Sequence, residues 1–208
     1  EIEIEVNNTL VGLNTKYDTG LFLYKELRLV IKYVLIGLQQ SNFPIKLTEY
    51  NNVLNDYLKL IKESDYDVSK KISVKDFMGP SSVTLQMINL LHESDVNDTN
   101  KSIPNIRKNY TVTDKADGMR KLLYVNDEGK IYLITSSMKL EYTGSYTEIK
   151  ELFNSLIDGE HILHGKNGEY LNLYAAFDIY FINKKNVTIH PFVNVTEKDT
   201  KEKEDTKE

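Results

Sequence analysis

The chain has 208 residues, of which 40% are hydrophobic and 27% charged, so it can bury one substantial core and part of a second. Its formal net charge of -5 argues against a protein that holds nucleic acid by overall positive charge, and any RNA contact must be local. The lack of cysteine excludes disulfides and thiolate zinc sites and favours a reducing compartment, so we expect a cytoplasmic protein.

The first six residues alternate strictly between Glu and an aliphatic residue, which is the period of a β-strand with one acidic face. Glu1, Glu3 and Glu5 share that face and repel one another unless a cation neutralises them. Carboxylate oxygens suit Mg²⁺ or Mn²⁺, so these three residues are a candidate metal site. A solvated acidic edge strand without metal is the alternative.

Two helices are expected next. Residues 21–39 and 47–62 carry apolar side chains at helical spacing, and Pro44 separates them, which predicts a helical hairpin. Charged side chains interrupt the first stretch, so it is not expected to span a membrane.

From residue 76 the pattern changes to shorter elements typical of β-structure. Strands are expected over residues 110–113, 121–125, 130–135, 157–163 and 171–182. Ser145 and Glu148 form a capping-box pattern, which predicts a helix that runs to Leu156. Residues 197–208 hold ten charged side chains and no apolar one, so we expect a disordered tail.

The residues that carry chemistry begin at Lys115, which is followed closely by Asp117, Gly118 and Arg120. A lysine amine that is held rigidly and can lose its proton is a nucleophile for covalent nucleotidyl transfer. Gly118 permits close approach of a ligand to the backbone, and Arg120 can donate to phosphate or ribose oxygens. Alone, this pattern also fits a solvated turn after an edge strand.

Two later segments make the pattern specific. Residues 156–160 form an apolar strand that ends in Asp-Gly-Glu, and residues 174–181 form a hydrophobic strand around a Phe-Asp pair. With the Lys115 segment they resemble, in order and spacing, motifs of the covalent nucleotidyltransferase superfamily. That superfamily holds mRNA guanylyltransferases and polynucleotide ligases.

The resemblance implies roles for individual residues. Lys115 would form a phosphoramidate with the nucleotide, and Glu160 would bind ribose hydroxyls. Asp117, Gly118 and Arg120 would complete the nucleotide site, and Phe177 would stack on the base. Phe177 and Asp178 should face opposite sides of an extended strand, so only one of them can line the pocket. The alternatives are a core position for Phe177 and a ligand-free strand end for Glu160.

Histidine gives a weaker metal hypothesis. His161 and His164 flank the same strand, but a spacing of three places them on opposite faces of an extended chain. A metal ion shared by these two residues is therefore not expected.

The acidic N-terminal strand favours capping over ligation. It resembles the last metal-binding strand of tunnel-type RNA triphosphatases, which precede the guanylyltransferase in capping enzymes of large nucleocytoplasmic DNA viruses. Segments 79–85, 130–134 and 142–144 are also similar to that viral family. The resemblance implies transfer of GMP from GTP to an RNA 5′ end with Mg²⁺ or Mn²⁺, in host cytoplasm or virion. RNA 5′-triphosphatase activity would belong to a longer parent protein.

The expected architecture is α+β: a partial capping-enzyme or ligase-like nucleotidyltransferase domain of antiparallel sheets with flanking helices. Its segments would be the end of a β-tunnel strand (1–13), a helical connector (14–75), the nucleotidyltransferase core (76–193) and a charged tail (194–208).

Later superfamily motifs and a closing barrel domain are not found in the sequence. We therefore expect a fragment of a larger capping polypeptide, with or without a methyltransferase, that forms little nucleotide adduct alone. Two alternatives stay open. One is an ATP-dependent polynucleotide ligase, and the other is a non-catalytic nucleotide-binding remnant or interaction module.

Overall fold

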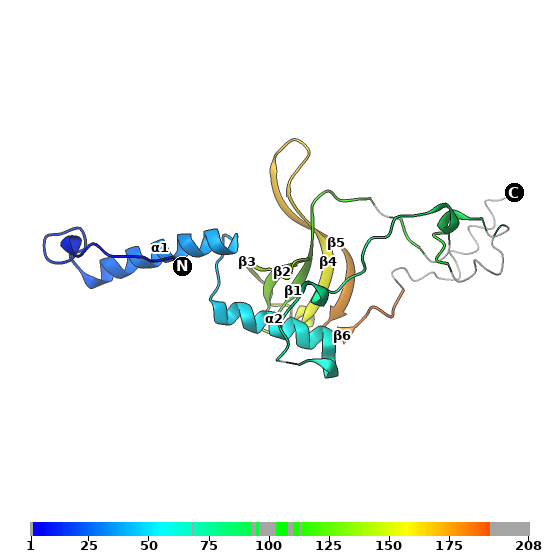
Figure 1. Ribbon diagram of the computed structural model, residues 1–208, viewed down its shortest axis with the longest axis horizontal. Coiled ribbons are helices and arrows are strands. Elements are labelled where there is room, and N and C mark those ends of the chain that lie inside the picture. The colour runs from blue at the N-terminus through cyan, green and yellow to red at the C-terminus, as the bar shows by residue number, and fades with distance from the viewer. Residues whose placement is uncertain are drawn as a thin grey trace.

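The computed structural model describes residues 2–67, 69–92, 95, 103–107, 110–112 and 114–191. At its centre is a six-stranded antiparallel sheet in the order β3-β2-β1-β4-β5-β6 (Figure 1). The strands are β1 (Met119–Val125), β2 (Lys130–Thr135), β3 (Leu140–Tyr146), β4 (Ser155–His164), β5 (Tyr170–Ile182) and β6 (Lys185–Asn186). The predicted hairpin is confirmed as β1 and β2, and the two later strands as β4 and β5.

Two α-helices accompany the sheet, α1 (Gly20–Gln39) and α2 (Leu47–Lys62), so the predicted α+β class is confirmed. Short 3-10 helices cover Asn8–Leu10, Glu63–Asp65, Val74–Asp76, Met87–Leu90 and Lys150–Leu152. α2 packs on the sheet through the buried residues Val53, Leu54, Tyr57 and Leu58. The strands contribute Leu122, Tyr124, Tyr132, Ile134, Leu140, Leu156, Tyr180 and Phe181 to the same core.

α1 extends away from the sheet instead of folding back along α2 (Figure 1). Thr19 caps its first turn by accepting a hydrogen bond from the Phe22 amide at 3.2 Å. The Gln39 side chain bonds both backbone groups of Ile45, which fixes the connection between the helices. No residue of α1 is buried. The predicted helix positions are therefore confirmed, whereas the predicted hairpin is wrong. Among the described residues, no helix is long and apolar enough to cross a membrane.

Two predicted strands do not form in the part of the chain that the structure describes. Residues 2–6 form no strand, and Glu1 lies outside the described residues. Residues 110–112 are also outside any strand, and Thr113 is not described. A strand needs a neighbour to satisfy its backbone groups, and neither segment has one among the described residues. The tail predicted for residues 194–208 lies outside the described residues as well.

The helix predicted from Ser145 to Leu156 is wrong. Ser145 belongs to β3, and Leu156 lies in β4, where it pairs with Tyr124 and is fully buried. Only Lys150–Leu152 forms a single turn of 3-10 helix between them. Short isolated helices are marginal, so strand pairing on both sides of this connection outweighs the local capping signal.

Candidate nucleotide-binding site

Three residues predicted from the sequence line one cavity of about 280 Å³: Lys115, Glu160 and Phe177. Lys115 lies with Asp114 and Ala116 on the segment before β1, and Glu160 lies on β4. β5 contributes Ala175, Ala176 and Phe177. The fold thus brings together three segments that are far apart in the sequence.

The side chain of Lys115 is exposed, and its amine makes few contacts with the rest of the described protein. The amine donates a hydrogen bond to the carbonyl oxygen of Ala116, at 3.3 Å. Within the described part of the chain, this amine forms no ion pair with a carboxylate. The Lys115 amine is therefore available to a ligand in the cavity.

Glu160 has one side-chain oxygen, Oε2, that is buried and has no hydrogen-bond partner among the described residues. A buried acceptor without a donor costs about 1–3 kcal/mol. Glu160 pairs in register with Ala175, and both residues line the cavity. The geometry favours a ligand that donates a hydrogen bond to this oxygen.

Two glycines hold the strands of the site close together. A Cβ at Gly118 would lie 2.7 Å from the carbonyl oxygen of His161, so this glycine lets the start of β1 approach β4. A Cβ at Gly159 would lie 2.6 Å from the carbonyl oxygen of Ala175 and 2.7 Å from the ring of Tyr174. Gly118 thus admits a neighbouring strand, and close approach of a ligand to its backbone stays a prediction.

Phe177 lies at an irregularity of β5. The register shifts between the pairs Asp158–Asp178 and Gly159–Ala176, which leaves Phe177 as an extra residue, a β-bulge. Phe177 is 38% exposed, so it is not a core aromatic. Asp178 borders a different cavity, as expected if only one of the two residues lines the site.

Arg120 and Asp117 are not among the described residues that line the Lys115 cavity. Arg120 forms an ion pair with Asp158, donates to the carbonyl oxygen of Pro80 at 2.7 Å and lies over the ring of Phe77. The hydrogen bond to Asp158 raises the pKa of Arg120 above its ordinary value. Asp117 is exposed. Ligand contacts of both residues stay predictions.

Comparison with known protein families identifies the family of this chain. Residues 96–206, more than half of the chain, match the family described as mRNA capping enzyme, catalytic domain. The chain belongs to this family. The matched range contains the whole sheet and every residue that lines the Lys115 cavity. No curated protein matches the chain significantly.

The capping-enzyme domain also uses tyrosines that the sequence analysis did not single out. The hydroxyl of Tyr180 donates to Asp158 at 2.5 Å, and burial raises the pKa of this phenol. The hydroxyl oxygen of Tyr174 lies 2.8 and 2.9 Å from the carbonyl oxygens of Lys121 and Ile157. The sequence signal for these contacts was a tyrosine within an otherwise apolar strand, because the hydroxyl of a buried tyrosine needs a hydrogen-bond partner.

The acidic N-terminal residues lie far from this cavity in the sequence. Glu3 and Glu5 are exposed, and Glu1 is outside the described residues. Over the described ranges, no group of three or more His, Cys, Asp or Glu residues gathers as a metal site. His161 contacts Lys121 and Asn172, and His164 packs edge-on against Tyr170.

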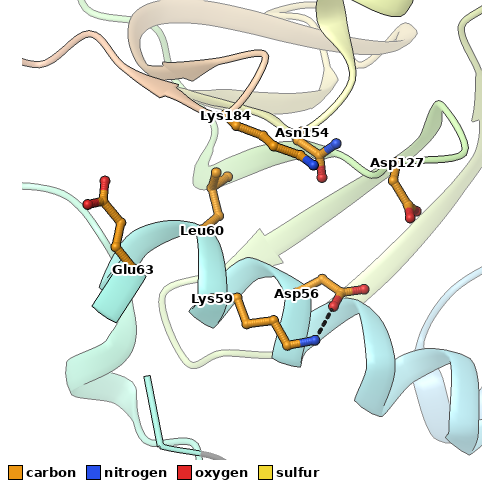
Figure 2. Close-up of a pocket in the computed structure, with 7 residues that line it drawn as sticks. All are labelled: Asp56, Lys59, Leu60, Glu63, Asp127, Asn154 and Lys184. Carbon is orange, nitrogen blue, oxygen red and sulfur yellow. Dashed lines mark hydrogen bonds and ion pairs between the residues drawn. The ribbon is translucent and has the colours of Figure 1, made fainter. Parts of the chain in front are cut away.

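A larger cavity, of about 410 Å³, lies between α2 and the turns at one end of the sheet (Figure 2). Lys59 in this cavity is already paired with Asp56 at 2.9 Å. With Glu63 and Asp127, the carboxylates here outnumber the two lysines, Lys59 and Lys184. This cavity contains none of the site residues predicted from the sequence, so the smaller Lys115 cavity is the better candidate nucleotide site.

Proposed function

We propose that this capping-enzyme domain is a GTP:RNA guanylyltransferase and that Lys115 is its nucleophile. One observation carries the proposal: the exposed Lys115 amine shares a cavity with Glu160 and Phe177. The family match supports mRNA capping over polynucleotide ligation, which uses the same lysine chemistry.

In the proposed reaction the Lys115 ammonium first loses a proton, because only the neutral amine is nucleophilic. Its Nζ attacks the α-phosphorus of GTP, a P–N bond forms, and the bond to the bridging oxygen breaks as pyrophosphate leaves. In the second step, an oxygen of the RNA 5′-diphosphate attacks the same phosphorus. The P–N bond then breaks, and the lysine amine takes up a proton.

The other residues of the cavity bind and orient the nucleotide. Glu160 Oε2 accepts a hydrogen bond from a ribose hydroxyl, which satisfies its unpartnered oxygen. The exposed ring of Phe177 stacks on the guanine base. The carboxylates of Asp114 and Glu160 would be the residues of this cavity that hold a Mg²⁺ or Mn²⁺ ion, which would supply positive charge to the triphosphate.

A second proposal concerns the acidic N-terminus and rests on its sequence pattern. Glu1, Glu3 and Glu5 would belong to the metal site of an RNA 5′-triphosphatase in a longer form of the protein. The exposure of Glu3 and Glu5 leaves them accessible for this role. Glu3→Gln with Glu5→Gln should remove triphosphatase activity but spare GMP transfer. Equal loss of both activities in a folded variant would contradict a separate site.

The test of the main proposal is covalent labelling. The chain, and any longer natural form that contains it, is incubated with GTP or ATP radiolabelled at the α-phosphate and with Mg²⁺ or Mn²⁺, then denatured and separated by electrophoresis. We expect an acid-labile adduct from GTP, faint for the 208 residues alone, that Lys115→Ala abolishes and Lys139→Ala does not. Lys115→Arg should also fail, since a guanidinium stays protonated.

Three outcomes of the labelling would change the assignment. An adduct that forms from ATP in preference to GTP would identify a ligase. GTP-dependent thermal stabilisation without an adduct in any form would identify a non-catalytic module. Labelling that persists in Lys115→Ala would assign the nucleophile to another residue.

A further inference from the structure

A basic concavity of about 340 Å³ is lined by residues at the end of α2 and in the loop that follows this helix. Four lysines and two aspartates are among its lining residues, namely Lys62, Lys70, Lys71, Lys75, Asp67 and Asp76. The concavity lies outside residues 96–206, which match the capping-enzyme family, and it is separate from the Lys115 cavity.

Both carboxylates of the basic concavity are already engaged. Lys62 forms an ion pair with Asp76. The carboxylate of Asp67 accepts hydrogen bonds from the amide and the hydroxyl of Ser69, at 2.9 and 2.7 Å, and these bonds lower its pKa. The negative charges are therefore already hydrogen-bonded to other groups.

The other three lysines, Lys70, Lys71 and Lys75, are exposed. Within the described part of the chain, their ammonium groups form no hydrogen bond or ion pair. Like charges in one concave surface repel one another, and an anion with several charges relieves that repulsion.

We propose that this basic concavity binds the phosphate backbone of the single-stranded RNA whose 5′ end is to be capped. The choice of RNA rests on the proposed function. The net charge of -5 repels RNA from the protein as a whole, so binding needs a local cluster of cations. Lysine is a compact point charge that suits phosphate. The half-buried ring of Tyr66 borders the same concavity, packs against the core and has the Lys59 amine 5.9 Å from its centroid.

Hydrogen bonds tie the concavity to the start of the catalytic sheet. The hydroxyl of Tyr57 donates to the carbonyl oxygen of Asp76 at 2.8 Å and accepts from the Met78 amide at 2.9 Å. Two residues later, the carbonyl oxygen of Pro80 accepts from Arg120 on β1. Arg120 lies five residues after Lys115 in the sequence. RNA bound at the concavity would therefore contact a segment that is hydrogen-bonded to the protein close to Lys115.

The test is fluorescence anisotropy with a single-stranded oligoribonucleotide of about 12 nucleotides, titrated with the full chain at several salt concentrations. Lys70→Ala, Lys71→Ala and Lys75→Ala are combined in one variant. Loss of three phosphate contacts should weaken RNA binding at least about tenfold and reduce the slope of log affinity against log salt by about two. The corresponding triple Lys→Arg variant should keep the affinity, because the charge is retained.

The matched control removes three exposed lysines outside the concavity, Lys139, Lys166 and Lys185, and should leave RNA binding within about twofold of the native chain. Equal loss in both triple variants, or unchanged binding in the first, would overturn the proposal. So would a polyglutamate peptide of equal charge that displaces the RNA as well as unlabelled RNA does, since that result indicates an acidic protein partner.

Adduct formation with GTP separates this proposal from the proposed function. The triple variant of the concavity should form the Lys115 adduct as the native chain does. If neither the native chain nor a longer natural form makes an adduct, while the triple variant loses RNA binding, the proposed function alone is contradicted. A native adduct together with unchanged RNA binding in the variant would contradict this inference alone.

Discussion

Arg120 on β1 and Asp158 on β4 form a bidentate ion pair, with Nε 3.0 Å from Oδ1 and Nη2 2.5 Å from Oδ2. The two residues belong to separate sequence motifs, one that follows Lys115 and one that ends in Glu160. Their contact fixes the lysine segment relative to the strand that carries Glu160. Arg120 is therefore a positioning residue in this structure.

The first prediction tests this ion pair. Arg120→Met should lower the free energy of unfolding by about 2–3 kcal/mol, because Asp158 would keep a buried carboxylate without its cation. The cost is less than for a fully buried pair, since the Arg120 side chain is 31% exposed. Adding Asp158→Asn should recover part of the loss. Urea unfolding of the single and double variants measures this, and strictly additive effects would show that the pair is not coupled.

A second prediction concerns acid stability and Asp76. Burial by itself opposes ionisation of this carboxyl, but hydrogen bonds from Lys62 and Ser73 outweigh it and hold its pKa below the ordinary value. A carboxyl with a lowered folded pKa stabilises the fold above its unfolded pKa of about 3.9, and this contribution is lost as pH falls through the folded pKa. Asp76→Asn should therefore reduce stability near neutral pH and flatten its decline in acid.

Urea unfolding at about pH 6 and about pH 3 measures the effect of Asp76→Asn. The gap between native and variant should be large at the higher pH and should shrink at the lower one. Asp18→Asn, at an exposed carboxyl, is the control and should leave the pH profile unchanged. A gap that stays constant across this range would mean that the pKa of Asp76 does not differ between the folded and unfolded states.

The third prediction concerns two effects of Glu160, one on thermal stability without ligand and one on GTP binding. Glu160→Gln should leave the melting temperature without ligand unchanged or higher, because the variant no longer buries an unpartnered carboxylate oxygen. It should weaken GTP binding about tenfold or more, since a hydrogen bond to a charged acceptor contributes about 1.5–3 kcal/mol. Thermal unfolding with and without GTP measures both effects. A variant that keeps the full GTP-induced shift would remove Glu160 from the nucleotide site.

Sequence periodicity and turn residues were sufficient to predict the elements that form between residues close together in the sequence. The period of residues 47–62 predicted α2, and the turn between Val125 and Lys130 predicted the β1–β2 hairpin. The proximity of Lys115, Glu160 and Phe177 followed from a family resemblance, because no local pattern relates them. The bulge at Phe177 and the partner of Arg120 depend on contacts between distant segments. Periodicity carries no information about such contacts.

The last prediction tests whether close approach of β4 and β5 positions the site. Gly159→Ala places a methyl group 2.6 Å from the carbonyl oxygen of Ala175 and 2.7 Å from the ring of Tyr174, so the strands must separate or the ring must move. Overpacking of this kind costs about 1–3 kcal/mol. Movement of Tyr174 would also weaken its bond from the Leu123 amide and shift the neighbouring Glu160. We therefore expect lower stability together with weaker GTP binding.

The same substitution at Gly37 is the matched control. Gly37 lies in α1 and is exposed, and a Cβ there would meet no atom within 4 Å. Alanine in a helix interior is more favourable than glycine by about 0.5–1 kcal/mol, so Gly37→Ala should raise stability and leave GTP binding unchanged. If the contacts at Gly159 position the site, urea unfolding should show stability changes of opposite sign in the two variants, and GTP titration should show weaker binding in Gly159→Ala alone. Native GTP affinity in a destabilised Gly159→Ala variant would show that Glu160 keeps its place without them.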